Sequence, residues 1–382
     1  MKGKKPLFAE LLHVGRPNIG DRAQLMSRFE DLLDRQWLTN DGPYVRAFEE
    51  AIAAYLGVRH CMAVNNATIG LQIAIRALDL QGEVIVPSFT FPATVHALAW
   101  EGLTPVFCDV DLSNHNLDPQ DVERLITPRT SAIMGVHLWG NPCEVDSLNL
   151  IARRHDLRLL FDAAHAFGCA RDGEMIGNFG DVEVFSFHAT KFLNSGEGGA
   201  IVTNDDALAE RIRRMRNFGL HQGEVTQLGT NGKMTEFCAA MGLTSFESRE
   251  IFIERNRDNH EAYRMALAEV PGVRILFPNQ AQGNAQYVVA EIDSRQAGVT
   301  REELFHALHA ENVLAKRYFT PGCHRLPPYA NDNASARRRL PNTEFLCERL
   351  LQLPTGCAVS GLDIARIGYF IQGLTARLRR AA

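Results

Sequence analysis

The chain has 382 residues, of which 46% are hydrophobic and 22% are charged. These proportions are ordinary for a folded globular protein, and the length predicts about two domains. The formal net charge of −5 gives no general attraction for polyanions, so nucleic acid is not an expected partner.

The first residues and the cysteines indicate the cellular compartment in which the protein is expected. The stretch M1-K-G-K-K-P-L-F8 carries charge without a long apolar core, so it does not predict a signal peptide. No apolar run approaches the ~20 residues that cross a bilayer, so no membrane partner is expected. The eight cysteines form no C-x-x-C pair, which is typical of reduced thiols and not of disulfides or zinc sites. We therefore expect a cytoplasmic protein without a bound metal.

Short apolar runs alternate with amphipathic stretches along the first 245 residues. Helices are expected near Arg22–Arg35 and at Tyr44–Leu56, where apolar side chains recur at helical spacing. Further helices are expected after N65-N-A-T68 and S88-F-T-F91. This rhythm predicts an α/β domain with a mostly parallel sheet flanked by helices. The expected strands are Cys61–Val64, Glu83–Pro87, Thr104–Asp109, Ser131–Leu138, Leu157–Phe161, Val182–Phe187 and Ala200–Thr203.

Beyond residue 245 the pattern indicates a smaller α+β region. A loop is expected from Tyr318 to Tyr329, continuing through Arg337–Pro341. The expected helices are Glu247–Ala268, Thr300–Glu311 and Leu362–Arg379, and the expected strands are Arg274–Phe277 and Gln286–Ile292. We therefore divide the chain into a large domain at residues 1–245 and a small C-terminal domain at residues 246–382.

Four polar clusters follow strands of the predicted sheet: N65-N-A-T68, S88-F-T-F91, D162-A-A-H165 and S186-F-H-A-T-K191. Ligands bind outside the carboxyl ends of strands in sheets of this kind. Because the clusters arise independently along the chain, their convergence on one edge is stronger evidence for a site than any single cluster.

Lys191 lies in a turn with Ser186 and His188, just before the glycine-rich G196-E-G-G199. A lysine there is a phosphate contact, a nucleophilic amine that forms a Schiff base, or an ordinary solvated side chain. N65-N-A-T68 opens a helix, so it is a phosphate seat or an ordinary N-cap. No G-x-G-x-x-G and no Walker motif supports a dinucleotide or nucleoside triphosphate site.

Asp162 ends an apolar strand, where a buried carboxylate needs a partner. An arginine, a cap or the pyridinium nitrogen of a cofactor would serve. A Schiff-base lysine, an aspartate and a phosphate seat are together what pyridoxal phosphate requires. Phe89 or Phe91 offers a flat ring to stack on it.

These segments, with P87-S-F-T-F91 and N231-G-K-M-T-E236, resemble the DegT/DnrJ/EryC1/StrS sugar aminotransferases over residues 13–375. The resemblance implies the fold of type I pyridoxal-phosphate enzymes, a large cofactor-binding domain followed by a small one. It makes Lys191 the Schiff-base lysine and pairs Asp162 with the pyridinium nitrogen. The other cofactor-binding residues that it implies are Ala67, Thr68 and Ser186 at the phosphate, Phe91 stacked on the ring and His165 beside it; many relatives have glutamine in place of His165.

The resemblance also implies a homodimer with shared active sites, because Asn231 matches a residue that reaches the partner subunit's cofactor phosphate. Lys233 stands where relatives usually have arginine. Lys233 is an expected substrate-binding residue, as are His188, Tyr318 and His324, although loop packing is the alternative for Tyr318 and His324.

F185-S-F-H-A-T-K191 differs from the F-S-F-Y-P-G-K typical of 3-aminotransferases. With V14-G-R-P-N18, W37-L-T-N-D-G-P43 and Y318-F-T-P-G-C-H324, it looks closest to enzymes that aminate C4 of dTDP-4-keto-6-deoxyglucose, in pathways such as O-antigen and lipopolysaccharide synthesis. L-Glutamate is the expected donor, and its carboxylate should share contacts with the sugar diphosphate. The alternatives are amination of a nucleotide-linked 3-keto-6-deoxy sugar, sugar dehydration, and a non-catalytic binding or regulatory protein on the same scaffold.

Overall fold

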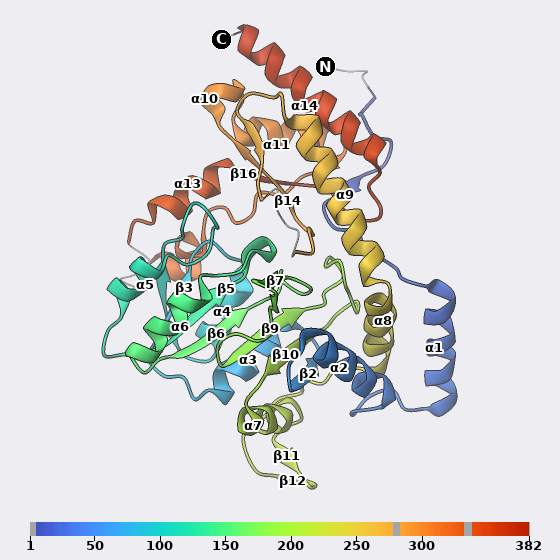
Figure 1. Ribbon diagram of the computed structural model, residues 1–382, viewed down its shortest axis with the longest axis vertical. Helices are drawn as coiled ribbons and strands as arrows, with labels where there is room; N and C mark the ends of the chain where they lie inside the picture. The colour runs from blue at the N-terminus through green and yellow to red at the C-terminus, as the bar shows by residue number, and fades with distance from the viewer. Residues whose placement is uncertain (1–4, 278–282, 332–337, 382) are drawn as a thin grey trace.

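The computed structural model describes residues 5–277, 283–331 and 338–381. A seven-stranded sheet forms the centre of the first domain, in the order β2-β10-β9-β6-β5-β3-β4 (Figure 1). Six strands run in one direction, and β10 is antiparallel to both of its neighbours. The strands are β2 (His60–Val64), β3 (Glu83–Pro87), β4 (Thr104–Cys108), β5 (Thr130–Val136), β6 (Arg158–Asp162), β9 (Val182–Ser186) and β10 (Gly199–Thr203).

The strands are apolar along their length because helices cover both faces of the sheet. Alternate side chains enter different cores: Val184 packs on one face, and Phe185 packs on the other. Contacts on the first face involve α3 (Ala67–Ala77), α4 (Pro92–Trp100) and α7 (Asp206–Arg216). The opposite face is covered by α2 (Pro43–Leu56), α5 (Pro119–Leu125), α6 (Val145–Arg154) and, beyond α2, α8 (Glu236–Glu247).

The second domain is built on a three-stranded antiparallel sheet in the order β13-β14-β16. The long helices α9 and α14 pack against each other, and α9 leads from the first domain into the second (Figure 1). The elements of this domain are α9 (Arg249–Leu267), β13 (Val273–Ile275), β14 (Val288–Ile292), α10 (Ser294–Ala297), α11 (Arg301–Ala310), β15 (Val313–Leu314), α13 (Pro341–Arg349), β16 (Leu350–Leu353) and α14 (Gly361–Ala381). The remaining elements introduced here are β1 (Leu12–His13), α1 (Arg22–Arg35), η1 (Leu138–Gly140), β7 (Ala170–Arg171), β8 (Glu174–Met175), β11 (Leu220–His221) and β12 (Glu224–Val225).

The α/β fold and every strand expected for the sheet are confirmed, with ends that differ by one or two residues. The linear division at residue 245 needs a correction at the N-terminal end. Strand β1 pairs in parallel with β15, and Phe8 packs in the core of the second domain. Leu7, Phe8 and Leu12 therefore belong to the core of the second domain, although they lie near the start of the chain.

In the second half, the helix expected at Glu247–Ala268 is confirmed as α9 (Arg249–Leu267), whereas α8, which ends at Glu247, was not expected. The loop expected from Tyr318 contains η2 (Cys323–Arg325) and α12 (Pro327–Ala330). Arg337 lies outside the described residues. Among the helices of the described ranges, none has the length and apolar character needed to cross a bilayer.

Candidate active site

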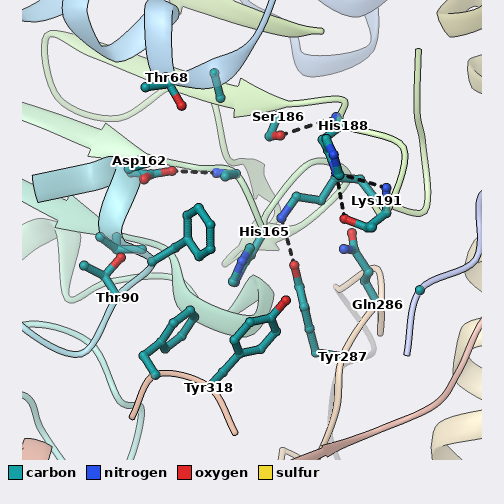
Figure 2. A pocket seen from close by; sticks show the side chains of 18 of the residues that line it. Thr68, Thr90, Asp162, His165, Ser186, His188, Lys191, Gln286, Tyr287 and Tyr318 are labelled. Atoms are coloured by element: carbon teal, nitrogen blue, oxygen red, sulfur yellow. Dashed lines mark hydrogen bonds between the residues drawn. The ribbon is translucent and has the colours of Figure 1, made fainter. Parts of the chain in front are cut away.

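A cavity of about 340 Å³ lies where the carboxyl ends of the sheet strands meet the second domain. Its size is in the usual range for a small-molecule site. The four polar clusters all contribute lining residues, as the clustering at strand ends predicted. Figure 2 shows Asp162, His165 and Lys191 pointing into it from the first domain, and Tyr287 and Tyr318 from the second.

Lys191 lies in the tight connection between β9 and β10. The backbone folds back on itself there, because Phe187 N–H donates to Gly198 and Ala189 N–H donates to Gly196. A Cβ at the neighbouring Gly199 would lie 2.7 Å from the backbone oxygen of Phe185 and 2.9 Å from the backbone nitrogen of Ala67, so glycine is required for this close approach. The connection thereby directs the Lys191 side chain into the cavity (Figure 2).

The Lys191 Nζ donates a hydrogen bond of 2.8 Å to the hydroxyl of Tyr287. Burial lowers the pKa of Lys191 from 10.5 to about 8, Asp162 opposes that shift, and Lys316 adds to it. About a tenth of the amine is therefore neutral at pH 7, far more than for an exposed lysine. Such an amine is both a nucleophile and a proton acceptor.

Asp162 ends strand β6 and is 6% exposed. Thr94 donates to one carboxylate oxygen at 2.7 Å, and the backbone N–H of Ala164 donates to the other at 3.0 Å. Burial nevertheless raises the pKa of Asp162. The ion pairs recorded among the described residues include none with Asp162, so this buried carboxylate is suited to a cationic group on a ligand.

His165 is buried beside the Tyr287 ring, with ring centroids 4.3 Å apart. Its Nδ1 accepts a hydrogen bond of 3.3 Å from the backbone of Trp139. Burial, assisted by the charge of Lys191, lowers the pKa of His165 well below its usual value. A neutral, flat imidazole therefore lines the cavity.

Helix α3 begins at the cavity with Ala67 and Thr68. The N-cap Asn66 accepts from the backbone of Ile69 at 2.9 Å, so the capping interpretation is confirmed. No hydrogen bond is recorded within the described residues for the N–H groups of Ala67 and Thr68. Two free donors at a helix N-terminus favour an anion, so the cap and an anion seat coexist.

Ser186 lines the cavity close to this helix, and His188 lies at the rim, bonded to Thr190 at 2.9 Å. Phe91 also lines the cavity and is 54% exposed, which leaves its ring available for stacking. Tyr318 contributes from the second domain. The proposed roles of these residues remain predictions.

The expected sugar contact from His324 is contradicted by its position. Its side chain is fully buried, bonded through Nδ1 to Ser88 at 2.6 Å, and lies outside the cavity lining. Loop packing, the alternative role, therefore fits His324. Asn231 and Lys233 also lie outside this cavity; Asn231 is exposed, and Lys233 is half-buried and bonds to Asn231 at 2.8 Å.

The lining residues that the sequence did not single out as site residues include Thr90, Gln286, Tyr287, Lys316, Phe319 and Gln352. Thr94 and Trp139, which bond to Asp162 and His165 from outside the lining, were not expected either. Most come from the second domain or from positions beside the polar clusters. The useful signal was the beginning of the expected strand Gln286–Ile292, where polar residues precede an apolar run. Metal binding finds no support within the described residues, where no group of three or more ligating side chains occurs.

Comparison with known proteins assigns the chain to a family. The DegT/DnrJ/EryC1/StrS aminotransferase family matches residues 20–372. The dTDP-4-amino-4,6-dideoxy-D-glucose transaminase of Shigella dysenteriae is 38% identical over 330 residues, which cover 86% of this chain and 88% of that relative. GDP-perosamine synthase of Vibrio cholerae is 33% identical over 330 residues, covering 85% and 89% of the two chains.

Solved structures agree in fold. The structure of DesI in the presence of its TDP-sugar product is 51% identical to this chain, with a TM-score of 0.93. The match covers 99% of this chain and 98% of that one. The chain therefore belongs to the DegT/DnrJ/EryC1/StrS aminotransferase family.

Proposed function

We propose that this aminotransferase uses pyridoxal 5′-phosphate to transfer the amino group of L-glutamate to C4 of dTDP-4-keto-6-deoxyglucose, giving dTDP-4-amino-4,6-dideoxyglucose. The observation that carries the proposal is Lys191, with a pKa lowered to about 8, in one cavity with the buried Asp162. The names of the Shigella relative and of the DesI structure support the substrate class.

The donor set of the cavity fits this cofactor. Asp162 forms none of the ion pairs recorded among the described residues, and it is bonded only to neutral donors, which suits it to a protonated ring nitrogen. The free N–H groups of Ala67 and Thr68, with Ser186, suit a phosphate. Phe91 would stack on the ring, and His165 would lie against it. A charge-assisted bond at Asp162 is worth roughly 1.5–3 kcal/mol.

When bound, pyridoxal phosphate supplies a carbonyl carbon that exchanges amines and a ring that accepts electrons. The protein supplies the proton transfers. The neutral amine of Lys191 takes the proton from the α-carbon of glutamate, and in the second half-reaction its ammonium form returns a proton to C4 of the sugar. Thr94 and the Ala164 N–H hold the Asp162 carboxylate in a fixed orientation.

A homodimer with shared sites is part of the proposal. Asn231 is exposed, and a groove that shares Thr68 and Phe91 with the cavity contains Trp100 and Leu228, which are 79% and 69% exposed. An apolar groove beside the site suits a second copy of the chain. Asn231 of that copy would reach the cofactor phosphate, with Lys233 beside it.

The cytoplasmic location remains a proposal as well. The eight cysteines are all unpaired, and six of them are buried. Buried thiols of this kind are typical of proteins in a reducing compartment.

The reaction is tested by incubating the purified protein with glutamate and dTDP-4-keto-6-deoxyglucose. The GDP-linked 4-keto-6-deoxymannose and a 3-keto isomer are tested in parallel. We expect NMR and mass spectrometry to find a 4-amino sugar from the dTDP substrate. An amine at C3, a dehydrated sugar, or no product from the 4-keto sugar would reject the assignment.

A second measurement does not depend on turnover. Borohydride should attach the cofactor covalently to Lys191, and the modified peptide identifies the residue by its mass. A colourless protein without a modified lysine would instead support the non-catalytic binding protein.

A further inference from the structure

The second domain places a short polar wall opposite the residues of the first domain. Lys316, Tyr318 and Gln352 form this polar wall, and all three line the cavity. Lys316 and Gln352 pair through their backbones, since each N–H donates to the other's carbonyl, at 3.0 and 2.8 Å. Gln352 belongs to strand β16, so the sheet of the second domain fixes the position of Lys316.

The charge of Lys316 is not neutralised by a neighbouring carboxylate. Its Nζ lies 3.4 Å from the hydroxyl of Tyr318 and 5.5 Å from that ring. None of the ion pairs within residues 5–277, 283–331 and 338–381 includes Lys316. Its positive charge nevertheless acts on the cavity, because it helps to lower the pKa of Lys191.

A comparison of the charged residues that line the cavity identifies Lys316 as the cation available for a ligand. Among the described lining residues, Lys191 is the other lysine, and no arginine occurs. In the proposed function Lys191 acts at the reacting carbon, so it is not available to bind a distant anion. Of the two lining carboxylates, Asp162 is bonded to Thr94, and Glu197 lies 3.7 Å from His188 at the rim.

Gln352 supplies an independent sign that the polar wall receives a ligand. Its side chain is 4% exposed, and its Oε1 is buried without a hydrogen-bond partner within the described structure. An unpaired polar atom of this kind costs free energy. A polar ligand in the cavity would offer it a donor, such as a sugar hydroxyl.

The two proposed substrates both carry an anion at a distance from the reacting carbon. In glutamate, the side-chain carboxylate lies three bonds beyond the α-carbon. In the sugar, the diphosphate is attached at C1, across the ring from C4. When the reacting carbon lies at Lys191, each anion therefore extends away from it. The polar wall lines the same cavity as Lys191, and Lys316 is close enough to Lys191 for its charge to lower the pKa of that lysine.

We propose that Lys316 is the shared anion contact of both half-reactions, binding the side-chain carboxylate of glutamate and then the diphosphate of the nucleotide sugar. This inference rests on the proposed function and names a specificity-determining residue for it. The shared contact explains how one cavity accepts two unlike substrates in turn. The diphosphate carries more charge than the carboxylate, so it should depend on Lys316 at least as strongly.

The test uses the full-length protein loaded with cofactor and two probes that do not react, glutarate and dTDP. Calorimetry measures their dissociation constants in the wild type, Lys316→Gln and Lys316→Arg. Arg295→Gln is the matched control, since it removes an exposed charge on α10 of the same domain. For Lys316→Gln we expect both dissociation constants to rise about tenfold, which is the lower end for a charged contact because Lys316 is exposed.

Lys316→Arg should bind both probes within about threefold of the wild type, and Arg295→Gln should be unchanged. The loss in Lys316→Gln should shrink as salt rises, because exposed charges are screened. In turnover, the KM for glutamate should rise while the slow reaction with L-2-aminobutyrate, which lacks the second carboxylate, should not change. A structural role would not produce this contrast.

Unchanged binding of both probes by Lys316→Gln would overturn the inference, and a loss confined to one probe would overturn the shared role. Failure of the proposed function would give a different experimental result from failure of the inference about Lys316. In that case the wild type itself makes no 4-amino sugar, whereas the comparison of glutarate binding still reports on Lys316.

Discussion

The two sides of the cavity differ in how firmly their polar groups are held. On the first domain, Asp162 and His165 are buried and fixed by hydrogen bonds from α4, from η1 and from the turn after β6. On the polar wall, Lys316 is exposed, and Gln352 keeps an unpaired oxygen. Groups that would hold and orient a cofactor need fixed geometry, whereas groups that accept two substrates in turn need free bonding capacity. The first domain therefore carries the chemistry, and the second carries the selection.

The largest expected effect tests the chemical side of this comparison. Lys191→Ala and Lys191→Arg should each lower turnover by at least about 10³-fold, because the amine that attacks carbon and moves the proton is lost. Circular dichroism should show that the fold is intact. Amination assays without added amine measure the loss. Substantial residual activity would remove Lys191 from the mechanism.

A mixed dimer tests whether the first domain completes its own site. One chain carries Lys191→Ala and the other carries Asn231→Ala, with different affinity tags for purification. If Asn231 serves the partner's cofactor, one site is doubly altered and the other is intact. Turnover per dimer should then be about half that of the wild type. If instead both sites are impaired, with lowered cofactor content and turnover well below half, the shared-site proposal fails.

The last prediction concerns the free energy of unfolding of the cofactor-free protein. Burial holds the pKa of Lys191 near 8, below the 10.5 of an exposed lysine. Below about pH 8 both the folded and the unfolded state carry the proton, so the folded state bears the full cost of a buried charge. Lys191→Met should therefore stabilise the cofactor-free protein by about 1–3 kcal/mol at pH 7.

This advantage should shrink as the pH rises from about 8 to about 10, because the folded wild type releases a proton that the unfolded chain retains. Thermal unfolding of the wild type and of Lys191→Met across that pH range measures the difference in their free energies of unfolding. Titratable groups that both proteins share contribute equally and cancel from this difference. A constant difference between pH 7 and pH 10 would mean that lost packing, and not the charge, accounts for it.

Sequence patterns predicted the first domain well because its strands are buried on both faces. Such strands form short apolar runs with clear polar ends, as at Val182–Ser186. The N-terminal residues were misplaced because β1 has two residues and pairs with a strand some three hundred positions away. No local pattern reports a partner at that distance.

The same reasoning applies to the site. Residues at strand ends, such as Asp162, could be named in advance because parallel strands share one edge. Tyr287 and Lys316 could not, since they reach the cavity only through the packing of two domains. His324 shows the opposite error: a histidine in a loop that covers the site belongs to the core of that loop.

The pairing of Leu12 with Val313 also has a consequence for synthesis on the ribosome. All seven strands of the central sheet have been made once Thr203 is added. Strand β1, in contrast, pairs with β15, which is made roughly 300 residues after β1 itself, or about 15–60 s later at about 5–20 residues per second. During that interval Phe8 has no core to enter. The nascent chain therefore carries an exposed apolar end that a chaperone could bind until the last helix emerges.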